Sequence, residues 1–201
     1  LTTLDVSNFN TGKVTSMQQM FYNCSSLTTL DVSNFNTEKV TNMQNMFNDC
    51  DKLTSLDLSN FDTTNVTNIG YMFSNCSSLT SLDVSNFNTA NVTSMTYMFN
   101  NCSSLTSLDL TNFNTTNVNN MSAMFNNCTS LNLLRIYESS KSTVESIIKL
   151  LPTRVNSLAV GNVEISITPP TGWRYKYVVP NTIAQYTCDK SGVLPTFNDG
   201  F

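Results

Sequence analysis

One 26-residue unit is written five times in succession and fills residues 1–130. The copies begin at Leu1, Leu27, Leu53, Leu79 and Leu105. No insertion or deletion separates them, so each residue of one copy has a counterpart at the same place in the next. A strict period in this range is typical of a solenoid, in which one short unit forms a coil and stacks on the next. The period therefore predicts the architecture, and it favours surface recognition over catalysis.

Each unit combines two hydrophobic periods, and positions are numbered here as in the first copy. Leu4 and Val6 alternate with polar residues, which is typical of a short strand with one buried face. Near the end of the unit, four apolar residues follow the i, i+3, i+4, i+7 spacing of one helix face: Met17, Met20, Phe21 and Cys24. Thr15 precedes them as a candidate helix N-cap. The sequence thus predicts a strand, a turning loop and a short helix in every coil.

Stacking the coils would align the apolar residues of successive copies into columns. One column is Phe9, Phe35, Phe61, Phe87 and Phe113, and another is Phe21, Phe47, Phe73, Phe99 and Phe125. The methionines beside the second column are Met20, Met46, Met72, Met98 and Met124. A stripe of methionines can bind a ligand, but its regular repetition favours core packing.

The pattern weakens after residue 130 without ending there. Leu131, Leu134 and Ile136 match the strand positions of the unit and predict a sixth strand. Residues 144–151 carry the spacing of an amphipathic helix. Leu158 lies in a predicted seventh strand, which follows a shorter coil of 24 residues. We therefore expect one solenoid domain over residues 1–163, with five regular repeats at 1–130 and degenerate coils at 131–163. No cap precedes Leu1, so we expect the chain to be a fragment of a longer array.

Residues 164–201 lie outside the repeat pattern. Two adjacent prolines, at 169 and 170, indicate a turn, and Trp173, Tyr175 and Tyr177 alternate with basic residues as in an edge strand. A solenoid needs its last apolar face covered, which favours a C-terminal cap. The start of a following module with a small aromatic binding patch is the alternative.

Composition excludes several classes of function. The chain contains no histidine, which removes histidine-dependent nucleophilic sites and His-ligated zinc. It also contains no glycine-rich phosphate-binding motif. We therefore expect a protein that is not an enzyme, with no catalytic residues and no cofactor.

Charge and hydropathy also restrict the partners. Residues 1–130 carry nine acids and three bases, whereas residues 131–201 carry five acids and seven bases. The repeats lack the basic stripe that a nucleic-acid partner requires. No apolar run is long enough to span a membrane. We accordingly expect no nucleic-acid binding, no membrane insertion and a monomeric chain.

Five cysteines occupy one repeat position: Cys24, Cys50, Cys76, Cys102 and Cys128. Cys188 is the sixth. An even count can indicate disulfides, but side chains at one buried position point in parallel, which favours free buried thiols. A metal site needs converging ligands rather than a column, so we expect no metal.

An aspartate also recurs once in every copy, at Asp5, Asp31, Asp57, Asp83 and Asp109. Each lies between two buried strand positions, so these side chains share one outward face about 5 Å apart. Like charges at this spacing should raise one another's pKa unless something offsets the repulsion. The local interpretation is that Ser and Thr at positions 3 and 7 hold the carboxylates and that Arg135 pairs with Asp109. The functional interpretation is a cation track or a binding stripe for a basic partner, and we expect no specific calcium site.

The unit LTxLDVSNFNTxxVTxMxxMFxNCSS resembles the repeat of the BspA-type leucine-rich-repeat surface proteins of bacteria. The resemblance covers residues 1–130 strongly and 131–163 through the strand positions. It implies a right-handed α/β solenoid with a parallel sheet on the concave face and short helices on the convex face. It also implies an exported, extracellular or cell-surface protein whose signal and anchor lie outside these residues.

Two functions remain open. The first is adhesion or protein–protein recognition of a host extracellular-matrix or cell-surface protein, with Asp5, Asp31, Asp57, Asp83 and Asp109 as the candidate binding residues of the concave stripe. The second is a structural spacer that projects another domain from the cell, which the near-identity of the copies favours. Variation is concentrated on the predicted loop and helix side, where Tyr71 and Tyr97 lie. Glycan binding would need exposed aromatic residues at positions 3, 5 or 7, and these positions have none.

Overall fold

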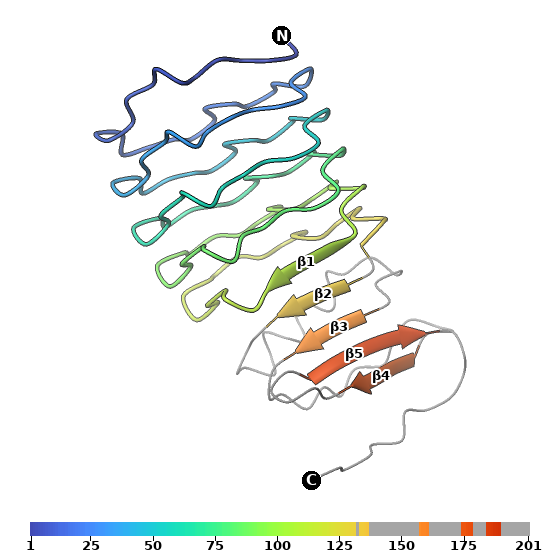
Figure 1. The fold of residues 1–201 in the computed structure, drawn as a ribbon. Coiled ribbons are helices and arrows are strands. Elements are labelled where there is room, and N and C mark those ends of the chain that lie inside the picture. The colour runs from blue at the N-terminus through green and yellow to red at the C-terminus, as the bar shows by residue number, and fades with distance from the viewer. Residues whose placement is uncertain (132, 137–156, 161–173, 179–183, 190–201) are drawn as a thin grey trace.

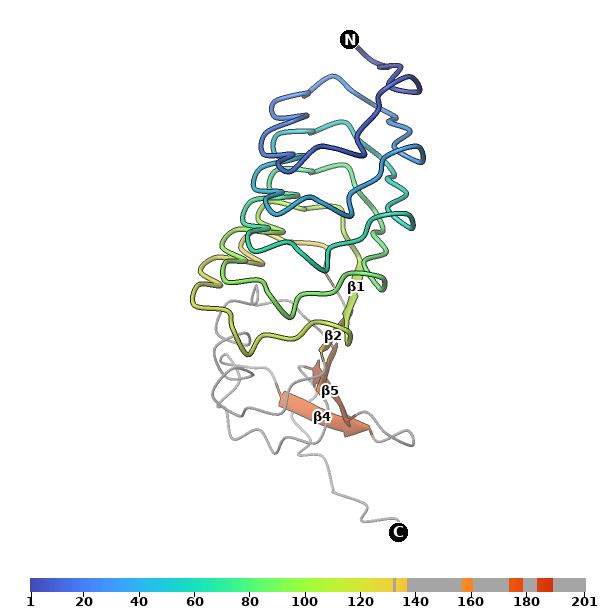
Figure 2. The ribbon, with the colours of Figure 1, turned by 90° about the vertical axis from the view of Figure 1, so that its left-hand side faces the viewer.

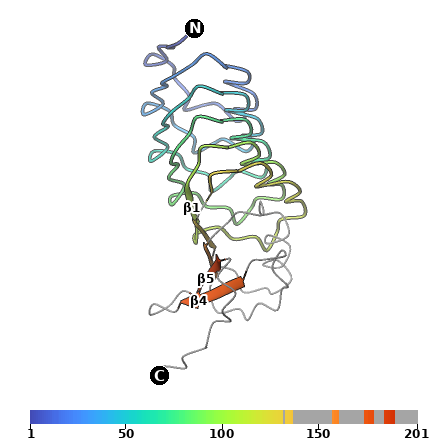
Figure 3. The ribbon, with the colours of Figure 1, turned by 90° about the vertical axis from the view of Figure 1, so that its right-hand side faces the viewer.

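Stacked coils of chain make up the repeat region in the computed structural model (Figure 1). The structure describes residues 1–131, 133–136, 157–160, 174–178 and 184–189. Each copy of the unit traces one coil, and equivalent stretches of successive coils run side by side along the stack (Figures 2 and 3). Parallel bridges join position 16 of each coil to position 16 of the next, at Ser16, Asn42, Asn68, Ser94 and Asn120.

The segment expected to be a short helix is instead a run of turns. In the first copy, the N–H groups of Met20, Tyr22 and Cys24 donate to carbonyls three residues earlier. Positions 19 and 23 have positive φ in every copy: Gln19, Asn23, Asn45, Asp49, Tyr71, Asn75, Tyr97, Asn101, Ala123 and Asn127. A right-handed α-helix requires negative φ throughout, so the helix prediction at positions 17–24 is wrong.

Pairing between coils explains why turns replace the helix. The N–H groups at positions 17, 19, 21 and 23 donate to carbonyls of the following coil; the Phe21 N–H, for example, lies 2.9 Å from the Met46 carbonyl. An α-helix would direct these groups along its own axis and leave none for the neighbouring coil. The prediction of Thr15 as an N-cap is also wrong. Its carbonyl accepts hydrogen bonds from the N–H and hydroxyl of Thr41 instead.

Regular strands begin in the fifth copy and form one sheet with the order β1-β2-β3-β5-β4. Strand β1 is Ser107–Leu110, β2 is Leu133–Ile136, β3 is Ser157–Val160, β4 is Arg174–Val178 and β5 is Ala184–Asp189. Strands β1, β2 and β3 are parallel. The predictions of a sixth and a seventh strand are confirmed, and the register of Leu133 with Ser157 reproduces the shorter coil.

The last two strands continue this sheet. Strand β5 pairs antiparallel with β3, and β4 lies outside β5 at the edge, which confirms the predicted edge strand. The predicted helix at 144–151, the proline turn at 169–170 and Trp173 lie outside the described residues. The division into a domain at 1–163 and a cap or module at 164–201 stays a prediction.

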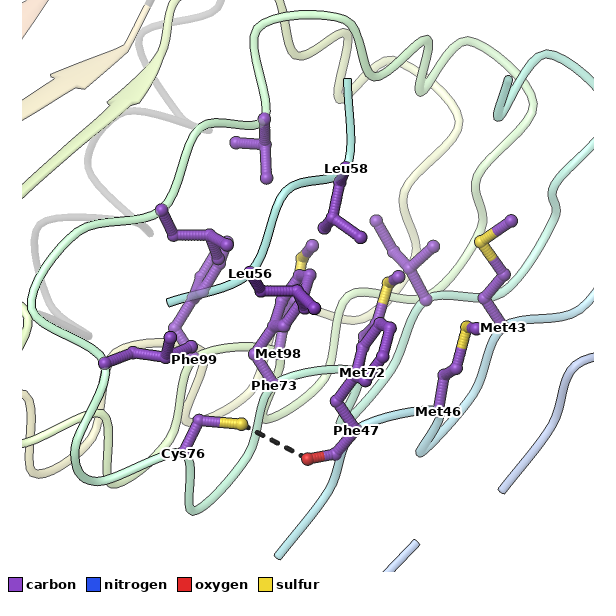
Figure 4. Close-up of a cluster of buried hydrophobic side chains, with 14 of the residues drawn as sticks. Met43, Met46, Phe47, Leu56, Leu58, Met72, Phe73, Cys76, Met98 and Phe99 are labelled. Carbon is purple, nitrogen blue, oxygen red and sulfur yellow. Dashed lines mark hydrogen bonds between the residues drawn. The ribbon is translucent and has the colours of Figure 1, made fainter. Parts of the chain in front are cut away.

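The core lies between the two sides of each coil. Leu56 and Leu58 enter it from one side, and Met72 and Phe73 enter it from the other (Figure 4). Phenylalanines at position 21 stack face to face along the coils, with ring centroids 5.6 to 5.9 Å apart. The methionines at position 20 are fully buried in the second to fourth copies, which confirms that the methionine column is core: Met46, Met72 and Met98. Burial of these columns supplies the main driving force for stacking.

Candidate recognition surface

The acidic column, as we call Asp5, Asp31, Asp57, Asp83 and Asp109, is exposed along its whole length. In the third copy, Leu56 and Leu58 are buried while Asp57 between them is exposed, as the alternation predicted. In the last coil Asp109 lies in β1, with its Cα paired with that of Arg135 in β2. The described side chains thus include one acidic row on the surface, carried by equivalent positions of successive coils.

Each carboxylate of the acidic column is held by the residue two positions later. Oδ1 of Asp57 accepts the backbone N–H of Ser59 at 2.9 Å, and the other copies repeat this bond. In the last copy the hydroxyl of Thr111 also donates to Asp109, at 2.7 Å. The local interpretation is therefore confirmed for position 7. A carboxylate held by its own turn keeps a fixed direction, so the column presents its charges in a regular order.

Four carboxyls of the column have a pKa below the ordinary value of 3.8: Asp5, Asp31, Asp57 and Asp83. For Asp57 the largest cause is the backbone N–H of Ser59, followed by the hydroxyl of the same residue. The charges of Asp31 and Asp83 raise the pKa of Asp57, but their effect is smaller than that of the two hydrogen bonds from Ser59. The offset that the sequence predicted is therefore present at position 7, and it leaves the pKa of these four carboxyls below the ordinary value. Hydrogen bonds to the ionised form outweigh repulsion that is screened by water.

Arg135 ends the acidic column as predicted. Its guanidinium Nη1 lies 3.5 Å from Oδ2 of Asp109, and both side chains are partly exposed. An exposed pair of this kind contributes little to stability. Its effect is to neutralise the last carboxylate, so the four preceding aspartates carry the net negative charge of the row.

The five cysteines of the repeat column are free thiols, as its regularity indicated. The Cys76 thiol donates to the carbonyl of Phe47 in the preceding coil at 3.2 Å (Figure 4), and Cys50, Cys102 and Cys128 repeat this contact. Burial raises the pKa of Cys50 to about 12 and that of Cys128 to about 12. Thiols with raised pKa react slowly, because the thiolate is the nucleophile. These cysteines are structural residues.

Two columns of polar residues that join the coils were not identified from the sequence: the threonines at position 11 and the asparagines at position 8. Thr63 is 1% exposed, and its hydroxyl donates to the Asn88 carbonyl while accepting the Asn88 N–H. Asn60 reaches back to the carbonyls of Val32 and Phe35 in the preceding coil. The signal available in the sequence was the invariance of Thr at position 11 and Asn at position 8 over the five copies. Both columns join coil to coil, so their function is structural.

The described part of the chain contains no group of three or more His, Cys, Asp or Glu side chains that could hold a metal ion. Within the same residues, no helix is long and apolar enough to cross a membrane. The acidic column spreads its carboxylates along the stack instead of converging them on one point. What the arrangement can do chemically is to attract and orient a partner that carries positive charge at intervals.

Comparison with known families gives one result. Residues 1–83 and 57–149 each match the profile of a family described as "Mycoplasma protein of unknown function, DUF285". Two overlapping matches to one profile are what a chain of repeated units should give. No curated protein and no solved structure matched the chain.

Proposed function

The chain belongs to the DUF285 family, and from this premise we propose that it is a non-enzymatic protein-recognition module. Its partner is a protein with regularly spaced basic side chains, and host extracellular-matrix and cell-surface proteins are the expected class. The observation that carries the proposal is the acidic column, in which an exposed carboxylate recurs in every coil and is held by its own turn.

Rigidity is the first support for this function. Oδ1 of Asp57 is already fixed by Ser59, and the core beneath it is closely stacked. A partner would therefore order few groups on binding, which lowers the entropic cost of association. A row of like charges also attracts an oppositely charged partner over several ångströms and speeds the encounter.

We further propose that the chain is an exported leucine-rich-repeat solenoid of the BspA type, right-handed, with its acidic column on the concave face. Support comes from the repeat itself and from the parallel pairing of β1, β2 and β3 at strand positions of the unit. Buried thiols also suit an exported protein, because burial protects them from oxidation in an oxidising compartment.

A structural spacer is the second candidate. Positions 3, 5 and 7 are almost the same in every copy, reading Thr or Ser, then Asp, then Ser or Thr. A specific binding site usually needs variation from coil to coil, and this surface varies little. A spacer needs only a stiff stack, which bonds between coils such as the Thr63–Asn88 pair would supply.

The test is surface binding of the full chain to a panel of immobilised matrix proteins, with and without calcium. The variant is the double substitution Asp57→Asn and Asp83→Asn, because an asparagine Oδ1 still accepts the turn hydrogen bond while the charge is lost. Asp62→Asn is the matched control: it removes one exposed charge outside the column, at a position where other copies carry Asn.

Saturable binding that weakens about tenfold in the double variant supports recognition through the column, since two lost ion pairs together are worth about 1.4 kcal/mol. Binding should persist without calcium and in Asp62→Asn. If a folded chain binds nothing on the panel, the spacer is the better interpretation. If binding is retained in the double variant, the acidic column is not the recognition surface.

A further inference from the structure

Tyr71 and Tyr97 form a stacked pair at position 19 of the third and fourth coils. Their ring centroids are 4.9 Å apart and their planes differ by 6°. Both side chains remain partly exposed. In the part of the chain that the structure describes, this is a stacked pair of tyrosines on the surface, whereas the stacked phenylalanines at position 21 are buried.

The pair lies across the core from the acidic column. Met72 and Phe73 follow Tyr71 in the chain and enter the core from the side opposite to Leu56 and Leu58, which flank Asp57 (Figure 4). A partner held by the tyrosines would therefore leave the acidic column free. The inference goes beyond the proposed function and does not depend on it.

The backbone fixes where the stack would continue. The Tyr97 N–H donates to the Ser122 carbonyl at 2.9 Å, which sets the fifth coil directly beside the fourth. Ala123 occupies position 19 of that coil with φ 53°, the same value as Tyr97. The phenylalanines two positions later, Phe99 and Phe125, stack at 5.9 Å across the same junction. A ring at position 19 of the fifth coil would thus lie parallel to Tyr97 at a similar distance.

Ala123 supplies only a methyl group at that place. The outer face of the Tyr97 ring, on the side away from Tyr71, therefore has no ring against it from the fifth coil. Ala123 is itself partly exposed. The surroundings are neutral, because the fourth and fifth copies carry one charge each, Asp83 and Asp109, both in the acidic column. A planar aromatic group can stack on this ring face in the offset arrangement that aromatic pairs favour, with no nearby charge to bind an anion.

We propose that Tyr97 and Ala123 form a docking site for one aromatic side chain of a protein partner. The incoming ring stacks on the outer face of Tyr97, rests on the Ala123 methyl group and extends the tyrosine pair to three rings. Thr96 and Asn120 lie in the same two stretches of chain, where the Thr96 hydroxyl donates to Asn120 Oδ1 at 3.3 Å and Asn120 Oδ1 also accepts the Ser122 N–H at 2.9 Å.

The test uses N-acetyltryptophanamide as the probe and the full chain labelled on alanine methyl groups for NMR. A ring stacked over Ala123 should move its methyl resonance upfield through the ring current, and the shift should saturate with probe concentration. Methyl β-glucoside is the second probe, because sugars also stack on aromatic rings.

Three variants sharpen the result. Tyr97→Asn removes the ring and keeps a residue that tolerates positive φ, as Asn45 does in the second coil; its apparent affinity should fall at least tenfold. Ala123→Tyr fills the site from within and should abolish binding of the probe while the chain stays folded. Tyr22→Ala removes an exposed tyrosine outside the pair and should leave binding unchanged.

The proposal is overturned if saturating probe leaves the Ala123 methyl unmoved, or if Tyr97→Asn and Tyr22→Ala bind it equally well. It is also overturned, in favour of a glycan site, if the glucoside shifts the methyl group and the tryptophan derivative does not. These outcomes do not depend on whether the Asp57→Asn and Asp83→Asn double variant loses binding to a protein partner through the acidic column.

Discussion

The buried threonine column offers the most direct test of how the coils are held together. Thr63 is 1% exposed, and its Oγ1 lies 2.7 Å from the Asn88 N and 2.9 Å from the Asn88 carbonyl oxygen. Thr63→Val keeps the shape of the side chain and removes both hydrogen bonds. We expect a marked loss of stability, because the Asn88 backbone groups would be left without these partners at the junction of two coils.

The magnitude follows from the two bonds. A hydrogen bond inside a protein contributes about 0.5–1.5 kcal/mol net, so the substitution should cost about 2 kcal/mol. With a urea m-value of about 2 kcal/mol/M, the unfolding midpoint should fall by about 1 M. The measurement is urea unfolding of the full chain followed by far-ultraviolet circular dichroism, with the m-value checked for constancy.

Thr67→Val is the matched control. Thr67 lies in the same coil, is exposed, and donates one hydroxyl bond of 3.1 Å to the Thr41 carbonyl. Water can replace this bond, so the control should lose less than about 0.5 kcal/mol. Equal midpoints for Thr63→Val and Thr67→Val would show that the buried threonines do not hold the coils together, and the reasoning would fail.

Four further predictions follow from the acidic column, the thiols and the core. The pKa of Asp57 in the folded chain lies below its unfolded value of 3.8. The ionised carboxylate therefore stabilises the fold fully above pH 3.8, and this stabilisation is lost as the pH falls through the folded pKa. The urea midpoint should drop between about pH 5 and pH 2, and it should drop less in Asp57→Asn. The pKa of Cys50 is about 12 against 9.0 for a free thiol, so the unfolded state ionises first and stability should decline as the pH rises above 9.0. Site-resolved mass spectrometry after alkylation of the native chain should accordingly label Cys24, which is half-buried, before Cys76; equal labelling would contradict the buried column. Met72→Ala should cost about 2–5 kcal/mol in urea unfolding because Met72 is fully buried, and a loss below about 1 kcal/mol would mean that the core collapses around the cavity.

Much of the fold was predictable from the sequence, because the columns depend only on the period. The exposure of Asp57 between Leu56 and Leu58, the ion pair of Arg135 with Asp109 and the free thiols all follow from placing equal positions side by side. The same reasoning located β2 and β3 beyond the regular repeats.

The helix prediction failed because two different structures share one hydrophobic spacing. Apolar residues at positions 17, 20, 21 and 24 face inward on a helix, and they also face inward on two successive turns. The asparagines at position 23, such as Asn75 and Asn101, were the available warning, since Asn adopts positive φ more readily than most residues. For the aspartates, the sequence predicted both the repulsion between coils and an offset by the residue at position 7. That the backbone N–H of Ser59 is the largest cause of the lowered pKa of Asp57 required the structure.

The repeated junction between coils has a consequence for how such a gene changes length. The donors at positions 17, 19, 21 and 23 meet the same carbonyls whether the first coil touches the second or the third touches the fourth. Excising the codons of one whole unit in frame would therefore bring two surfaces together that already fit, and duplicating a unit would do the same. Slippage and unequal crossing-over at such a locus should yield alleles of different length whose products still fold, so the length of the stack becomes a heritable variable that selection can adjust one coil at a time.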